Sequence, residues 1–207
     1  MPDLAVPYFL ARPRAEPPWP GVVVAHEGPG ISPQLLRWCQ RLAAEGYAVI
    51  APDLYFRRGG TGAADFMELM QSLTPEQVLG DLAEARDVLT SAGAAKVGIT
   101  GFCNGGLQTY RAATRTKDFA AAVGFYGARI AQELGEPTCP TLLFYGADDP
   151  YIPTEEVEAV RAQHGDNVVV YDGATHGFMR DGSDAFHETA AADAWQRLLD
   201  FFGTHLR

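Results

Sequence analysis

Three residue types that together can perform nucleophilic catalysis follow one another along the chain. They are Cys103, the neighbouring carboxylates Asp148 and Asp149, and His176. A thiol needs a base to become a thiolate nucleophile, and an imidazole needs a carboxylate to fix its tautomer and stabilise its cation. The set therefore predicts acyl transfer through a covalent intermediate on Cys103. Spacing alone leaves Asp148 and Asp149 as equal candidates for the acid.

The surroundings of Cys103 make it the most specific of these candidates. It is the centre of Gly101-Phe102-Cys103-Asn104-Gly105-Gly106, between a strand-like run at 96–100 and an Ala-rich amphipathic segment. Strand, G-x-nucleophile-x-G and helix in this order are typical of a nucleophile elbow. The turn is too tight for nearby Cβ atoms, which is why glycines flank it. Cys39 and Cys139 lack this context and are expected to fill space in the core.

A fourth candidate, Glu27, lies at the end of an apolar strand and precedes Gly28-Pro29-Gly30. We interpret this segment as an oxyanion loop. The backbone N–H groups of Gly28 and Asn104 would stabilise the charge that develops at a tetrahedral intermediate. A carboxylate at this strand end should point towards Cys103, although a solvated strand-end residue is the alternative. The adjacent His26 is expected to be structural.

Strand-like and helix-like segments alternate along the chain, which predicts a mostly parallel sheet covered by helices on both faces. In such sheets, sites form at the C-terminal ends of the strands, where all the candidates above fall. Strands are expected at 6–11, 21–26, 47–51, 96–100, 120–126, 141–145 and 168–171. Helices are expected at 32–45, with Ser32 as N-cap and Pro33 at the first position, and at 75–92, 107–115, 154–163 and 184–205. The segment 57–74 has no strong periodicity.

Composition favours a single globular domain over residues 1–207, with 47% hydrophobic and 20% charged residues. The formal charge of −10 argues against a nucleic-acid partner, but it leaves room for an anionic substrate because local arginines decide that point. No apolar run approaches the ~20 residues that cross a bilayer, and Met1-Pro2-Asp3-Leu4 lacks the features of a signal peptide.

The three cysteines have no CxxC spacing, which indicates free thiols in a reducing cytoplasm and neither a disulfide framework nor a zinc site. We expect no cofactor and no metal, and a monomer or small homo-oligomer that acts on a small molecule.

A cysteine nucleophile narrows the class of substrate. A thiolate attacks a carbonyl well, but it also leaves well. After attack on an alkyl ester, the intermediate therefore tends to expel the thiolate instead of the more basic alkoxide. An enol ester or lactone releases a stabilised enolate of much lower basicity. Cys103 thus favours activated esters, enol-lactones or thioesters over ordinary lipids.

Taken together, five segments of the chain resemble the dienelactone hydrolase family, also called carboxymethylenebutenolidases. The segments lie at 26–30, 51–55, 101–106, 146–153 and 176–180, and they span most of the chain in the family's order. The resemblance implies an α/β-hydrolase fold with a mostly parallel central sheet, helices on both faces, a shortened N-terminus and no large cap domain.

For the site, the resemblance implies Cys103 as nucleophile, His176 as base and Asp149, which precedes a Pro-Tyr-Ile-Pro run, as acid. It also implies that Glu27 contacts the resting thiol. In the family the bound substrate carboxylate displaces this glutamate, which then takes the thiol proton. The arginine that binds the carboxylate in the family falls on Arg180.

A second family arginine lies in a helical segment where this chain is shorter and offers only Arg57 and Arg58, so Arg57 is the second expected substrate-binding residue. The predicted function is hydrolysis of a small activated ester or enol-lactone through a Cys-His-Asp triad. One alternative is a promiscuous carboxylesterase or thioesterase on the same scaffold. Another is a non-catalytic ligand-binding or redox-sensing protein that uses Cys103 as a reactive thiol.

Overall fold

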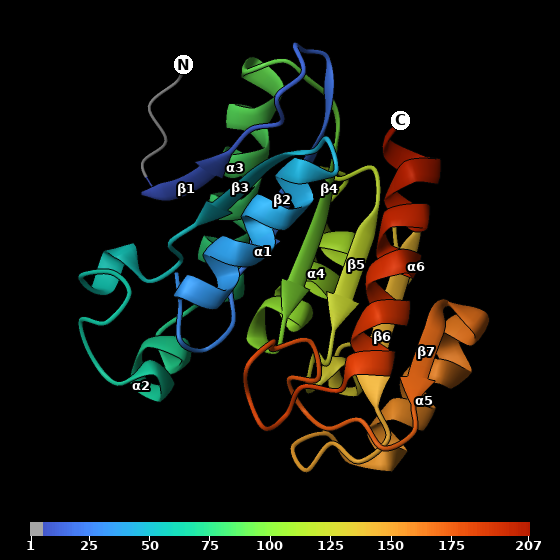
Figure 1. Ribbon diagram of the computed structural model, residues 1–207. Helices are drawn as coiled ribbons and strands as arrows, with labels where there is room; N and C mark the ends of the chain where they lie inside the picture. The colour runs from blue at the N-terminus through green and yellow to red at the C-terminus, as the bar shows by residue number, and fades with distance from the viewer. Residues whose placement is uncertain (1–5) are drawn as a thin grey trace.

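A seven-stranded sheet forms the framework of the computed structural model, which describes residues 6–207 (Figure 1). The strands are β1 (Tyr8–Ala11), β2 (Trp19–Ala25), β3 (Ala48–Pro52), β4 (Ala94–Phe102), β5 (Ala122–Phe125), β6 (Thr141–Gly146) and β7 (Val168–Tyr171). Their order in the sheet is β1-β3-β2-β4-β5-β6-β7. Only β1 is antiparallel to its neighbour. The mostly parallel sheet is confirmed, while the prediction about Met1-Pro2-Asp3-Leu4 lies outside the described residues.

Helices cover both faces of the sheet, as predicted (Figure 1). They are α1 (Pro33–Ala44), α2 (Phe66–Gln71), α3 (Pro75–Ser91), α4 (Asn104–Arg115), α5 (Thr154–His164) and α6 (Glu188–Leu206). Helix α1 begins as expected, because the Ser32 side chain accepts a hydrogen bond from the Leu35 N–H and Pro33 follows it. Helix α6 begins four residues later than the expected 184.

The segment without periodicity contains the short 3₁₀ turn η1 (Phe56–Arg58) and α2, which the sequence did not predict. Helix α2 buries only Leu69, so it has no apolar stripe to produce a helical period. Its local signal is Asp65, whose side chain caps the Met67 N–H.

The core lies in two layers, and one of them anchors the strand that ends at Cys103. Trp38 of α1 packs edge-on against Trp195 of α6, with ring centroids 4.8 Å apart, and against Phe102 at 4.5 Å. Phe102 also stacks on Phe125 of the neighbouring strand at 4.9 Å. Aromatic packing on both sides of Phe102 therefore holds the end of β4 in place.

Two glycines allow α4 to begin directly at the strand ends. A Cβ atom on Gly105 would lie 2.1 Å from the backbone oxygen of Ala25, and one on Gly106 would lie 2.5 Å from that of Phe125. Any larger residue would push α4 away from the sheet, and Cys103 with it. Within the described part of the chain, no helix is long and apolar enough to cross a membrane.

Candidate active site

Cys103 occupies a sharp turn between the end of β4 and the start of α4. Its backbone has φ 54° and ψ −118°, a conformation that non-glycine residues rarely adopt. The Cys103 N–H donates to the Phe125 backbone oxygen at 3.0 Å, which ties the turn to β5. The N-terminus of α4 follows at once, and this end of a helix favours negative charge. The half-buried thiol is thus held where a thiolate would be stabilised.

His176 lies between the thiol and a buried carboxylate. Its Nδ1 is 2.7 Å from Asp149 Oδ2, and the other carboxylate oxygen accepts the Tyr151 N–H at 2.8 Å. The Asp149 side chain is fully buried, whereas Asp148 is exposed. The structure therefore brings Asp149, and not Asp148, to the histidine. With Nδ1–H donated to the carboxylate, Nε2 is left to face Cys103.

Opposing effects act on the pKa of His176. Burial lowers it, but hydrogen bonds to Asp149 and Cys103 outweigh burial and raise the pKa from 6.5 to about 9. The imidazole lies between two aromatic rings, with centroids 5.0 Å from Tyr126 and 5.1 Å from Tyr151. The net rise in pKa favours the protonated form of His176 in the resting protein.

Glu27 is almost fully buried, and it pairs with Arg180. Its Oε2 accepts hydrogen bonds from Arg180 Nε at 2.9 Å and Nη2 at 2.6 Å. Gly177 leaves room for the Arg180 side chain, because a Cβ atom at position 177 would lie 3.3 Å from the Arg180 guanidinium. No hydrogen bond joins Glu27 to Cys103 among residues 6–207. A charged guanidinium is a stronger partner than a thiol, which explains why the expected resting contact to Cys103 is replaced.

The loop that carries Glu27 presents a free backbone donor. Neither the Gly28 N–H nor the Asn104 N–H donates to an acceptor within the described residues. The Tyr55 hydroxyl donates to the Gly28 carbonyl at 2.9 Å and so holds the loop. Both N–H groups therefore remain available to an acceptor from outside the described residues, as an oxyanion hole requires.

His26 holds the same loop through hydrogen bonds of both its ring nitrogens. Its Nε2 accepts the Leu54 N–H at 3.1 Å, so its Nδ1–H donates to the Glu27 carbonyl at 2.8 Å. Complete burial lowers the pKa of His26 and keeps the ring neutral. The histidine therefore has the structural position that the sequence predicts.

Arg57 is not brought to Cys103. Its two terminal nitrogens bind both oxygens of Asp81 in α3, at 2.5 and 2.6 Å. Asp81 is almost fully buried, so its charge requires a partner. Arg57 and Arg58 line a separate small cavity that does not include Cys103. The expectation that Arg57 binds the substrate is therefore not supported by its position.

A cavity of about 470 Å³ opens beside Cys103 on the side of α4. Its lining includes Cys103, Asn104, Gln108, Arg111, Met67 of α2 and Arg129 from the loop after β5. Sequence reasoning did not identify the last four of these residues. They carry no motif, and the cavity that joins them forms only when α2 packs near α4.

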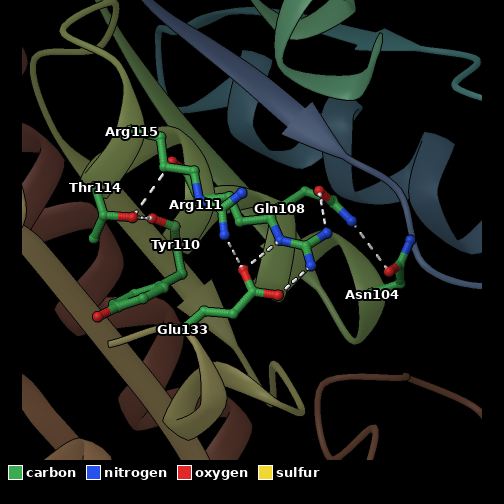
Figure 2. A network of polar contacts seen from close by, with 7 residues as sticks. All are labelled: Asn104, Gln108, Tyr110, Arg111, Thr114, Arg115 and Glu133. Atoms are coloured by element: carbon green, nitrogen blue, oxygen red, sulfur yellow. Dashed lines mark hydrogen bonds and ion pairs between the residues drawn. The ribbon is translucent and has the colours of Figure 1, made fainter. Parts of the chain in front are cut away.

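A chain of polar contacts runs from the elbow along α4, and Figure 2 shows it. Gln108 donates to Asn104 Oδ1 at 3.3 Å, and Arg111 donates to Gln108 Oε1 at 3.3 Å. Arg111 is held in turn by Glu133, through Nε at 2.7 Å and through a second hydrogen bond from Nη2. This pairing lowers the pKa of Glu133. The Glu133 carboxylate thus orients Arg111, and through it the side-chain amides of Gln108 and Asn104.

Comparison with known proteins identifies relatives over almost the whole chain. The model of the dienelactone hydrolase family matches residues 6–206. A Salmonella typhimurium protein, provisionally named a carboxymethylenebutenolidase, is 36% identical and aligns with 97% of this chain and 83% of its own. The carboxymethylenebutenolidase of Pseudomonas putida is 31% identical over 90% of this chain and 86% of its own. A solved Klebsiella pneumoniae structure, provisionally named a dienelactone hydrolase, is 35% identical, with a TM-score of 0.86 over 97% of this chain and 93% of that one.

Proposed function

Because this chain belongs to the dienelactone hydrolase family and is a carboxylic ester hydrolase with the α/β-hydrolase fold, we propose that it cleaves a small activated ester or enol-lactone through Cys103. The observation that carries the proposal is the 2.7 Å hydrogen bond between His176 and the buried Asp149, beside a cysteine at a strained elbow. The unpartnered N–H groups of Gly28 and Asn104 support it. We further propose that the protein acts in a reducing cytoplasm, where its unpaired cysteines remain thiols.

Acylation begins with transfer of the thiol proton. An anionic group of the substrate that reaches Arg180 competes with Glu27 for the guanidinium. Glu27, once released, accepts the proton of Cys103. The thiolate then attacks the carbonyl carbon, and the oxyanion is stabilised by the Gly28 and Asn104 N–H groups. When the tetrahedral intermediate collapses, the enolate leaves and takes a proton from the His176 imidazolium.

Deacylation uses His176 in its neutral form. In the acyl-enzyme the Cys103 sulfur is a thioester, so it no longer offers the hydrogen bond that helps to raise the pKa of His176 in the resting site. The pKa therefore falls when the ring must act as a base. His176, oriented by Asp149, takes a proton from water as the water attacks the thioester, and the released thiolate recovers its proton from Glu27.

Replacement of the thiol tests this proposal. We expect Cys103→Ala to lower kcat for an activated aryl ester by at least about 10³-fold, because the covalent step is lost. Cys139→Ala is the matched control, since Cys139 is another free cysteine with no place in the site. Retention of most of the hydrolytic rate by Cys103→Ala would exclude the cysteine mechanism.

A further inference from the structure

The cavity beside Cys103 is cationic in a protein of formal charge −10. Two of its lining residues are arginines, Arg111 and Arg129, and no acidic residue is among the described residues that line it. Glu133, outside the lining, pairs with Arg111 and also with Arg115, so one carboxylate offsets only part of the positive charge of this region. A concave site lined by one sign of charge concentrates ligands of the opposite sign, even when the whole protein repels them. The cavity thus selects for negative charge close to the nucleophile.

The polar contacts along α4, drawn in Figure 2, determine which side-chain atoms donate and which accept. Arg111 can only donate, so Gln108 must accept through Oε1 and donate through its amide nitrogen. Asn104 must then accept through Oδ1. This leaves Asn104 Nδ2 as a buried donor without a partner among residues 6–207, on a side chain that is only 7% exposed. A buried unsatisfied donor is costly, and an acceptor from a ligand would satisfy it.

Arg129 differs from the other arginines of this region. Its guanidinium makes no hydrogen bond or ion pair with another described residue, whereas Arg111 and Arg115 both bind Glu133. Its backbone is in the left-handed region, with φ 67°. Within the described chain the other non-glycine residues of this kind are Cys103 and Tyr126, which both lie at the site. Such backbone conformations cluster where function requires a particular side-chain position.

We propose that Arg129 binds a carboxylate of the substrate in this cavity, several bonds away from the carbonyl that Cys103 attacks. Met67, Met70 and Leu107 supply the apolar surface for the carbon skeleton between the two groups. The inference rests on the proposed function, because it assumes that an ester bond is cleaved at Cys103. It assigns specificity to a residue on the opposite side of the thiol from the Glu27–Arg180 pair.

Matched esters separate this role from a general effect on catalysis. The para-nitrophenyl monoester of glutaric acid carries a free carboxylate, and its methyl diester is the neutral analogue. A second pair, para-carboxyphenyl acetate and its methyl ester, places the carboxylate on the leaving group. In Arg129→Gln, we expect kcat/KM for the anionic member of at least one pair to fall about 10- to 100-fold, as loss of a charge-assisted contact predicts. The neutral member should lose less than about threefold. Arg161→Gln, which removes an exposed charge from α5, is the control and should change neither.

Calorimetry gives a readout that does not need turnover. Cys103→Ala should bind the anionic ester more tightly than the neutral one, and addition of Arg129→Gln should reduce that preference to what Arg180 supplies. Equal losses on anionic and neutral esters, or no loss on either pair, would overturn the assignment of Arg129. If Cys103→Ala instead hydrolyses both esters at the wild-type rate, the proposed function fails, and the binding preference still decides the role of Arg129.

Discussion

The two sides of Cys103 use the same kind of cation in opposite ways. On one side, Arg180 is locked onto Glu27, and the free space beside the pair is about 10 Å³, enough for one water molecule. On the other side, Arg129 is exposed and lines a cavity of about 470 Å³. It makes no hydrogen bond or ion pair with the described residues, although the charge of Glu133 is close enough to interact with it. An arginine that is already paired must give up its partner to bind a substrate, whereas an unpaired one binds without that cost. The closed side is therefore suited to triggering the reaction and the open side to selecting the substrate.

The strongest test of the closed side is Glu27→Gln. If Glu27 accepts the thiol proton, the amide cannot replace it, and kcat should fall by about 10²- to 10⁴-fold for anionic esters, whose negative group can displace Glu27 from Arg180. The measurement is steady-state hydrolysis of the ester pairs used for Arg129. This is a loss of kcat in the proton-transfer step, in contrast with the loss of preference for anionic esters expected on the open side.

Glu158→Gln provides the matched control for this prediction, because it removes an exposed carboxylate in α5. Wild-type kcat in Glu27→Gln would mean that Glu27 serves only as the counter-charge of Arg180. The proposal that the Glu27–Arg180 pair triggers the reaction while Arg129 selects the substrate would then be wrong.

The same contrast should be visible in stability. Arg180→Gln leaves the buried Glu27 carboxylate without its partner, and we expect it to lower the free energy of unfolding by about 2–3 kcal/mol. Arg129→Gln removes no contact within the described chain and should cost less than about 0.5 kcal/mol. Urea unfolding of both variants at neutral pH measures the difference. Equal losses would show that the environment of Arg129 is as constrained as that of Arg180.

Much of this fold follows from local sequence signals. The Ser32-Pro33 start of α1, the apolar strands and the elbow at 101–106 each depend on neighbouring residues, so the sequence predicted them. Asp149 could be preferred to Asp148 only through the family resemblance, since both follow the same strand. The structure adds the reason that one is buried against His176 and the other is exposed.

What the sequence did not predict depends on contacts between distant residues. Glu27 and Arg180 are 153 positions apart, so their pairing is invisible in any local pattern. Arg57 was expected at the site through the family resemblance, and no nearby signal shows that Asp81, 24 residues later, holds it. Arg129 has importance only because of a left-handed backbone and a cavity shared with α2 and α4.

His176 lies between the two sides and gives the most gradual of the expected effects, because one proton changes the free energy of unfolding by at most about 1.4 kcal/mol per pH unit. Its pKa is raised from 6.5 to about 9 in the folded protein, so the folded state binds the proton more tightly than the unfolded chain does. The stabilisation is therefore fully present below about pH 6.5 and is lost as the pH rises towards 9, with a total on the order of 3 kcal/mol. Urea unfolding between these pH values should show this decline in the wild type and a flatter profile in His176→Gln.

Two further variants show whether Cys103 or Arg129 contributes to this pH dependence of the free energy of unfolding. Cys103→Ala removes one of the groups that raise the pKa of His176, so it should shift the decline to lower pH. Arg129→Gln removes a charge that does not titrate in this range and should leave the slope unchanged. A profile in Arg129→Gln as flat as that of His176→Gln would mean that the open side is electrostatically coupled to the histidine. The roles of Arg180 and Arg129 would then not be separate, because Arg129, which selects the substrate, would also influence the protonation of His176.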